Sequence, residues 1–69
     1  MSEHVYKKVE LVGSSKNSIE DAAQQAITKA SETLHNMRWM EVTEIRSHLV
    51  DVKIDHWQVG VKVGFTLDD

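Results

Sequence analysis

The sequence predicts an α+β domain with the element order β-α-β-β, in which a three-stranded antiparallel sheet, ordered 1-3-2, curls around one helix. Both ends of the chain alternate between apolar and polar residues, as half-buried strands do, and a segment between them repeats apolar residues at helical spacing. The chain has 69 residues, 41% of them hydrophobic and 28% charged, which is typical of a globular domain. We expect a single domain over residues 1–69, with strands at about 4–12, 38–50 and 54–67 and a helix at about 18–35.

The first predicted strand is the segment VYKKVELV, residues 5–12. Small, turn-favouring residues follow in the segment GSSKNS and should end this strand. Ser18 precedes Asp21 by three positions, which is the spacing of a capping box with Asp in place of Glu. The helix should therefore begin near Ser18. The apolar residues of the first strand that share one face are Val5, Val9 and Leu11.

The predicted helix has a narrow apolar stripe made mostly of alanine. Small side chains let a helix approach another backbone closely, so a sheet can curl tightly around this face. His35 and Asn36 should end the helix, because Asn tolerates the left-handed conformation common at helix ends. The residues of the stripe are Ile19, Ala22, Ala23, Ala26, Ile27, Ala30 and Leu34.

The rest of the chain predicts a hairpin of two strands joined across residues 51–53. Residues 57–67 alternate strictly between apolar and polar or glycine positions, so one face of the last strand should be core. A turn centred on Val52 fixes the register, and a slip of one residue would destroy the matching of the two strands. At this register Ile45 meets Val59 and Thr43 meets Val61 on the helix side, while Arg46 meets Gln58 and His48 meets His56 on the outer side.

The third strand should lie between the other two, because a right-handed crossover and hairpin pairing both place it there. One helix can cover only one face of such a sheet. The other face is expected to carry Tyr6, Met40, Val42, Gly60 and Gly64 and to be available for subunit contacts or a ligand. A chain of this size without disulfides has a small core, so we also expect a homo-oligomer.

Composition excludes several classes of function. The chain has no cysteine, and therefore no thiolate nucleophile or thiolate metal site. A net charge of -3 with only 8 basic residues argues against a nucleic-acid surface. No apolar run approaches the ~20 residues of a membrane helix. The N-terminus lacks the pattern of a signal peptide, so we expect a cytoplasmic protein without a membrane partner. No phosphate-binding loop or nucleophile with a base is present, and Glu41 and Glu44 should project to opposite faces of their strand.

Three segments carry a specific pattern: VYKKVELVGSS, MRWMEVTEIRSHLVD and HWQVGVKVGFTLDD. Together they resemble the bacterial dodecins, a family of small flavin-binding proteins, and the resemblance runs over essentially the whole chain. Trp39, in a W-x-E-V segment, and Gln58, before a glycine-containing last strand, occur together at the expected separation. The resemblance implies a β-α-β-β protomer assembled into a hollow dodecamer, with pairs of flavins in pockets between protomers.

The resemblance also implies roles for four residues. Trp39 would stack on the isoalloxazine ring, and Gln58 would hydrogen-bond to the polar edge of that ring. Arg46 would contact the phosphate of FMN, and His48 occupies a position where some members touch the ring edge. The implied cofactor is FMN, or else riboflavin or FAD, and some bacterial members also hold coenzyme A. These residue types suit the roles, since an indole offers a stacking plane, an amide both donates and accepts, and a guanidinium forms a fork for phosphate.

Without the resemblance, Trp39 has a plainer interpretation as a core residue. Strand parity places it with Ile45 on the helix side, opposite to Gln58 and Arg46. One protomer could then not gather all three residues around one ligand. Either the pocket combines several chains, or a β-bulge near Trp39 directs its side chain to the other face.

The polar candidates also have plainer interpretations. Gln58 could be an ordinary exposed residue, and Arg46 could form a surface ion pair with Glu44, Asp51 or a neighbouring subunit. His48 and His56 face each other across the hairpin, but two ligands make a weak metal site. The sequence therefore predicts no metal site and treats the pair as surface histidines or, for His48, as a contact to the flavin.

The function that the sequence predicts is a non-catalytic flavin-binding oligomer. It would store or buffer FMN or a related flavin and would quench the flavin's photochemistry by stacking on Trp39. One alternative is a structural oligomer that binds mainly coenzyme A, and another is a small flavoenzyme.

Overall fold

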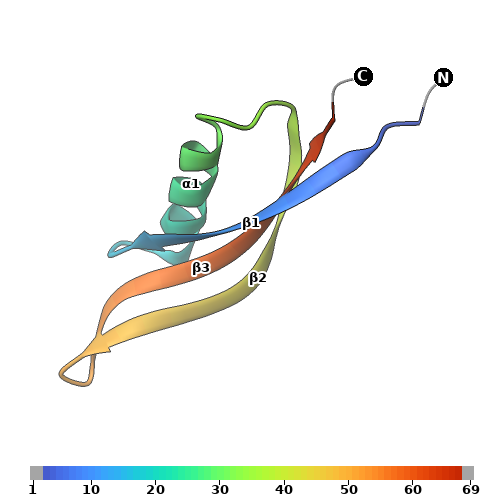
Figure 1. Ribbon diagram of the computed structural model, residues 1–69. Helices are drawn as coiled ribbons and strands as arrows, with labels where there is room; N and C mark the ends of the chain where they lie inside the picture. The colour runs from blue at the N-terminus through green and yellow to red at the C-terminus, as the bar shows by residue number, and fades with distance from the viewer. Residues whose placement is uncertain (1–2, 68–69) are drawn as a thin grey trace.

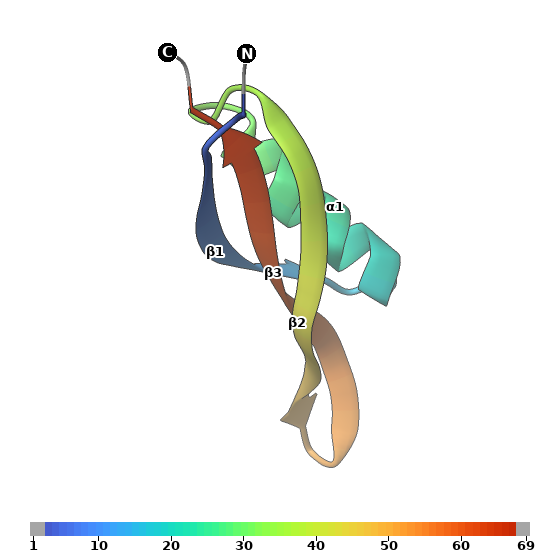
Figure 2. The ribbon, with the colours of Figure 1, turned by 90° about the vertical axis from the view of Figure 1, so that its right-hand side faces the viewer.

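The computed structural model describes residues 3–67, which form three strands and one helix (Figure 1). In chain order these are β1 (Tyr6–Ser15), α1 (Ile19–Ala30), β2 (Met37–Val50) and β3 (Lys53–Thr66). β3 pairs antiparallel with both other strands, which gives the order β1-β3-β2. Figure 2 shows the strands side by side with α1 on one face of the sheet. The predicted fold class and strand order are confirmed.

The core lies where α1 crosses the centre of β3. Small side chains on the helix bring its backbone close to the sheet, where they pack on the valines of β3. Trp57 is partly buried and packs against this cluster. The buried apolar residues are Ala22, Ala23, Ala26, Ala30, Val59, Val61 and Val63.

β1 is longer than the sequence predicts, because the expected turn residues continue the sheet. Gly13, Ser14 and Ser15 pair with Val59, Gln58 and Trp57. A side chain at Gly13 would overlap the carbonyl oxygen of Ala22, so glycine is required where the strand passes under the helix. The prediction that this strand ends at residue 12 was wrong, since strand pairing outweighs the turn-favouring composition.

α1 begins as predicted and ends earlier. Ser18 is its N-cap, with its hydroxyl oxygen accepting a hydrogen bond from the Asp21 backbone N–H at 3.0 Å. The helix ends at Ala30, five residues before the predicted boundary. There the hydroxyl of Ser31 donates to the carbonyl of Thr28, and the N–H groups of Glu32 and Thr33 bond three residues back, which tightens the last turn. Asn36 does adopt the left-handed conformation, with φ 64°, but it leads into β2 instead of ending the helix.

The middle of the hairpin follows the predicted register up to a β-bulge at Thr43, and two further shifts lie between Met37 and Trp39 and between His48 and Leu49. The last one pairs Val50 with Lys53, so the turn is not centred on Val52 as predicted. The pairs of Ile45 with Val59, Arg46 with Gln58 and His48 with His56 are all present. Thr43 does not pair with Val61, because Val42 takes that place and Glu44 is next in register, opposite Gly60. Thr43 is therefore an extra residue in β2, and the alternation of side chains differs on its two sides.

The bulge changes which residues of β2 lie on which face. Met40 and Val42 pair with the buried Val63 and Val61, so they lie on the helix side and not on the outer face where the sequence placed them. Glu41 pairs with Lys62 and therefore shares the outer face with Glu44, against the prediction that the two project oppositely.

The β2–β3 hairpin extends well past the helix (Figure 1). The molecule measures 56 × 20 × 13 Å along its principal axes. Asp51 and Val52 form the turn with φ of 52° and 64°, and the Val52 side chain is almost completely exposed. The exposed apolar residues of this arm are Leu49, Val50, Val52 and Ile54, and Ile45 is exposed next to it, at the edge of the sheet opposite Val59.

Candidate functional site on the outer face of the sheet

Trp39 lies on the outer face of the sheet, at the end of β2 near the chain termini. It pairs with Gly64, and its indole occupies the space where a side chain of residue 64 would be. Tyr6 of β1 meets it edge to face, with ring centroids 5.2 Å apart. The indole stays 41% exposed. The indole of Trp39, called the aromatic plate below, therefore packs on the backbone at Gly64 and leaves part of its surface available to a planar ligand.

The bulge at Thr43 is the reason that Trp39 lies on this face. Strand parity counted from Arg46 puts Trp39 on the helix side, and one extra residue between them reverses that assignment. A second register shift, between Met37 and Trp39, adjoins the indole itself. The plainer interpretation of Trp39 as a core residue was therefore wrong, and Trp39, Arg46 and Gln58 share the outer face.

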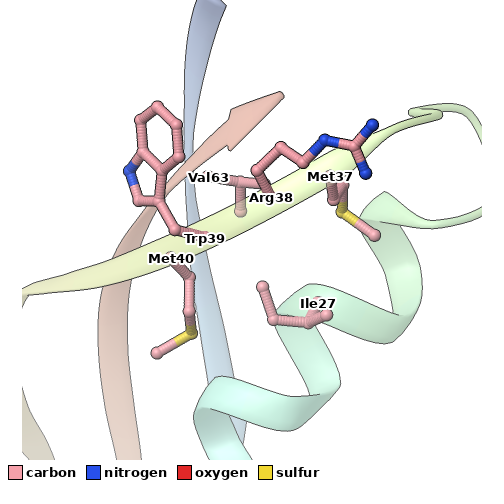
Figure 3. Close-up of a pocket in the computed structure, with 6 residues that line it drawn as sticks. All are labelled: Ile27, Met37, Arg38, Trp39, Met40 and Val63. Carbon is pink, nitrogen blue, oxygen red and sulfur yellow. The ribbon is translucent and has the colours of Figure 1, made fainter. Parts of the chain in front are cut away.

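Figure 3 shows the consequence at β2, where Trp39 points away from the helix and Met40 points toward it. Below the strand, an apolar hollow of about 210 Å³ opens between β2 and α1. It is smaller than the pockets of ~300–1,000 Å³ that usually hold small molecules. The residues that line it are Ile27, Met37, Arg38, Trp39, Met40 and Val63.

We expect Gly64→Ala to disturb the indole without disturbing the fold. An added methyl group would overlap the six-membered ring of Trp39, and the indole must rotate away. Gly60→Ala is the comparison variant, since its methyl group would meet the side chains of Thr43 and Glu44 at the bulge and would not touch the indole directly. Intrinsic tryptophan emission and thermal unfolding, measured on both variants, test this. Unchanged emission of Gly64→Ala would contradict the placement of the indole.

A chain of polar contacts occupies the other half of the outer face, toward the hairpin tip. Glu44 Oε1 lies 2.6 Å from Nη1 of Arg46, and Arg46 donates from Nε to Oε1 of Gln58 at 2.8 Å. Nε2 of Gln58 lies 3.4 Å from Nε2 of His56, whose Nδ1 lies 2.6 Å from Oδ2 of Asp55. The predicted alternative for Arg46, an ion pair with Glu44, is thus present.

The two histidines of this region stack on each other. The rings of His48 and His56 have centroids 5.1 Å apart and planes 23° apart. Asp55 Oδ1 lies 3.6 Å from the Lys16 ammonium. The hydrogen bond from His56, with the positive charge of Lys16, holds the pKa of the Asp55 carboxyl below its usual value.

One protomer brings together Gln58, Arg46 and His48 but leaves Trp39 apart from them. Trp39 pairs with Gly64, and Gln58 precedes Gly64 by six residues on β3, a distance of about 20 Å at the rise of a strand. No single planar ligand of the size of an indole or a fused tricycle spans that distance. The aromatic plate and the polar chain of one protomer therefore serve different sites, or each is completed by another copy.

Two contacts on this face could not be predicted from the sequence. Tyr6 was assigned to this face, but its contact with Trp39 needed the three-dimensional pairing. Adjacent residues of a regular strand point to opposite faces, so the sequence does not predict a contact between the side chains of Asp55 and His56. A β-bulge between the pairs of His48 and Leu49 allows this contact. Among residues 3–67, no three His, Asp or Glu side chains gather closely enough to hold a metal ion. The same part of the chain has no helix with the length and apolar character needed to cross a bilayer.

Comparison with known proteins identifies one family. Residues 5–68 match the family model described as Dodecin. A curated dodecin from Thermus thermophilus is 45% identical over 65 residues, which are 94% of each chain. The solved dodecin from Streptomyces davaonensis has a TM-score of 0.93 and 47% identity, covering 99% of this chain and 100% of that one. The dodecin from Streptomyces coelicolor also has a TM-score of 0.93, with 43% identity over 100% of this chain and 99% of that one.

Proposed function

The chain belongs to the dodecin family, and from this premise we propose that it forms a dodecamer that binds FMN or a related flavin between its copies. In this proposal the protein stores or buffers the flavin and performs no catalysis. The observation that carries the proposal is the half-exposed indole of Trp39 on the outer face, supported by the bare backbone of Gly64.

The proposed contribution of Trp39 is to stack on the isoalloxazine ring and quench its excited state. A planar heterocycle stacked on an aromatic side chain gains about 1–3 kcal/mol. Indole is also the strongest electron donor among the side chains, so a stacked flavin loses its excitation to it before photochemistry occurs.

The proposed contribution of Gln58 is to orient the ring. Its amide has an oxygen with two lone pairs and a nitrogen with two hydrogens, of which Arg46 and His56 each engage one. One acceptor and one donor remain, and they suit a ring edge on which carbonyl and N–H groups alternate. Because Trp39 and Gln58 of one protomer lie about 20 Å apart, the plate and the amide that hold one flavin come from different copies.

Titration of the purified, flavin-free protein with riboflavin, FMN and FAD tests this proposal. Emission of the added flavin should fall as it binds, and unfolding the complex should restore it. Full emission at protein concentrations well above those of the flavin would contradict it. Repeated turnover in the dark, in which an added electron donor is oxidised and an added acceptor is reduced, would instead indicate a flavoenzyme.

We expect Arg46→Ala to weaken the binding of FMN more than the binding of riboflavin, because only FMN carries a phosphate. A hydrogen bond to a charged group contributes about 1.5–3 kcal/mol, so the extra loss for FMN should be about 10- to 150-fold. Arg46 keeps donors free for this contact, since its ties to Glu44 and Gln58 use only Nη1 and Nε.

The control for this prediction is Lys29→Ala, which removes one positive charge from α1, away from the outer face. It should leave both affinities unchanged. Equal losses of FMN and riboflavin in Arg46→Ala would assign Arg46 to the support of Gln58 alone.

A further inference from the structure

The side-chain amide of Gln58 is held at both of its polar atoms. Its oxygen accepts from Nε of Arg46 at 2.8 Å, and its nitrogen lies 3.4 Å from Nε2 of His56. The other ring nitrogen of His56, Nδ1, lies 2.6 Å from Oδ2 of Asp55. Hydrogen bonds therefore connect the Asp55 carboxylate through the His56 ring to the Gln58 amide, which is proposed to contact the ligand.

The chemistry of these groups permits only one arrangement of protons at neutral His56. An ionised carboxylate only accepts, so Nδ1 of His56 carries the hydrogen and donates it to Asp55. Nε2 is then the acceptor of the ring. The amide nitrogen of Gln58 can only donate, and it fits that acceptor. The lowered pKa of the Asp55 carboxyl keeps this group ionised.

A reversed amide would lose both hydrogen bonds. Its NH₂ group would face the N–H of Arg46, and its oxygen would face the lone pair of His56, so two donors and two acceptors would oppose each other. We propose that Asp55 and His56 are positioning residues that fix the orientation of the Gln58 amide, and that a second proton on His56 releases it. This inference rests on the proposed function, since the orientation matters for a ligand that Gln58 contacts.

Protonation of His56 turns its Nε2 from an acceptor into a donor. The Gln58 amide must then rotate so that its oxygen accepts from His56, and the hydrogen bond from Arg46 to that oxygen is lost. The free donor and acceptor of the amide also exchange places, so they no longer match the ring edge of the flavin. The charged and titratable groups around His56 are Asp55 on its own strand, His48 stacked on it from β2, Lys16 before α1, and Arg46 and Glu44 beyond Gln58. Flavin affinity should therefore fall as the pH falls from 8 to 5, the interval in which an imidazole usually gains its charge.

The test measures the affinity for riboflavin between pH 5 and 8, since riboflavin has no phosphate that titrates in this interval. The wild type should bind about five- to tenfold more weakly at the acid end, the effect of one lost hydrogen bond. His56→Phe keeps a ring to stack on His48 but has no nitrogen, so its affinity should be low and independent of pH. Asp55→Asn should weaken the binding of riboflavin at pH 8, because an amide can donate as well as accept and no longer fixes the proton of His56 on Nδ1.

His35→Gln serves as the control, since it removes an imidazole from the turn between α1 and β2 and should behave as the wild type does. Size-exclusion elution at each pH shows that the assembly persists. An equal dependence on pH in the wild type and His56→Phe, or none in the wild type, would overturn the proposal.

A second measurement needs no flavin. The ¹⁵N spectrum of histidine-labelled protein at pH 8 should show one ring with its proton on Nδ1, and this signal should be missing in His56→Phe. If it is present but riboflavin binds at no pH, the positioning of Gln58 stands and the flavin proposal fails. If the wild type lacks it, the positioning proposal fails, whatever riboflavin does.

Discussion

Replacing Trp39 by alanine is expected to weaken flavin binding by about 5- to 150-fold, which is the loss of one stacking contact of about 1–3 kcal/mol. Flavin that still binds should regain emission, because its electron donor is gone. The fold should tolerate the change, since the indole is half-exposed and rests on Gly64 and Tyr6 outside the core. Titration by flavin emission, with size-exclusion elution as a check on assembly, measures both effects.

Trp39→Phe is the matched control for this prediction. Phenylalanine keeps a planar ring at the same place but is smaller and a poorer electron donor. It should retain more affinity than alanine does, with weaker quenching than the wild type. An alanine variant with the affinity and quenching of the wild type would remove Trp39 from the flavin site.

Replacing Gly13 by alanine is expected to lower the melting temperature by about 10–20 °C. The new methyl group would overlap the carbonyl oxygen of Ala22 and lie 3.0 Å from the Ala26 side chain. A helix backbone cannot rotate away as a side chain can, so α1 must move off the buried alanine–valine core. Overpacking of this kind costs about 1–3 kcal/mol or more, and each kcal/mol moves the transition of a domain this small by about 4–8 °C.

Ser14→Ala is the control for Gly13→Ala, because Ser14 is the next residue of β1 and is exposed on the opposite face. Thermal denaturation of both variants at one protein concentration makes the comparison. A melting temperature of Gly13→Ala equal to that of Ser14→Ala would contradict the close approach of strand and helix.

The strand order and most of the register could be predicted because β3 alternates without a break. Its apolar side faces a stripe of alanines, and a turn placed near Val52 was close enough to give the pairs of His48 with His56, Arg46 with Gln58 and Ile45 with Val59. The ends of β1 and α1 were harder to predict. Both depend on tertiary pairing and on hydrogen bonds in the last turn, which local composition does not determine.

The bulge at Thr43 decides which face carries Trp39, and a β-bulge near Trp39 was one of the two possibilities that the sequence left open. The residues of β2 do not show where the extra position lies. Its place is indicated by the opposite strand, at Gly60, where the absence of a side chain leaves room for both Thr43 and Glu44. A glycine at such a position is typical of a bulge or of a close approach of backbones, and here the bulge is the one present.

Some of the candidate residues could be predicted from the sequence and others could not. Trp39 and Gln58 were found through the resemblance to a family, whereas the pairs of Arg46 with Gln58 and His48 with His56 followed from strand register. The contact of Asp55 with His56 depends on a second irregularity of the hairpin and could only be found in three dimensions.

The long arm beyond the helix has a consequence for how the protein is made. Until another copy arrives, a new chain exposes Ile45, Leu49 and Ile54 along strands whose outer edge is also unpaired. Such an edge invites aggregation, because any extended chain can add to it. Productive encounter between copies therefore competes with misassembly, and slow synthesis at low temperature should raise the yield of usable material.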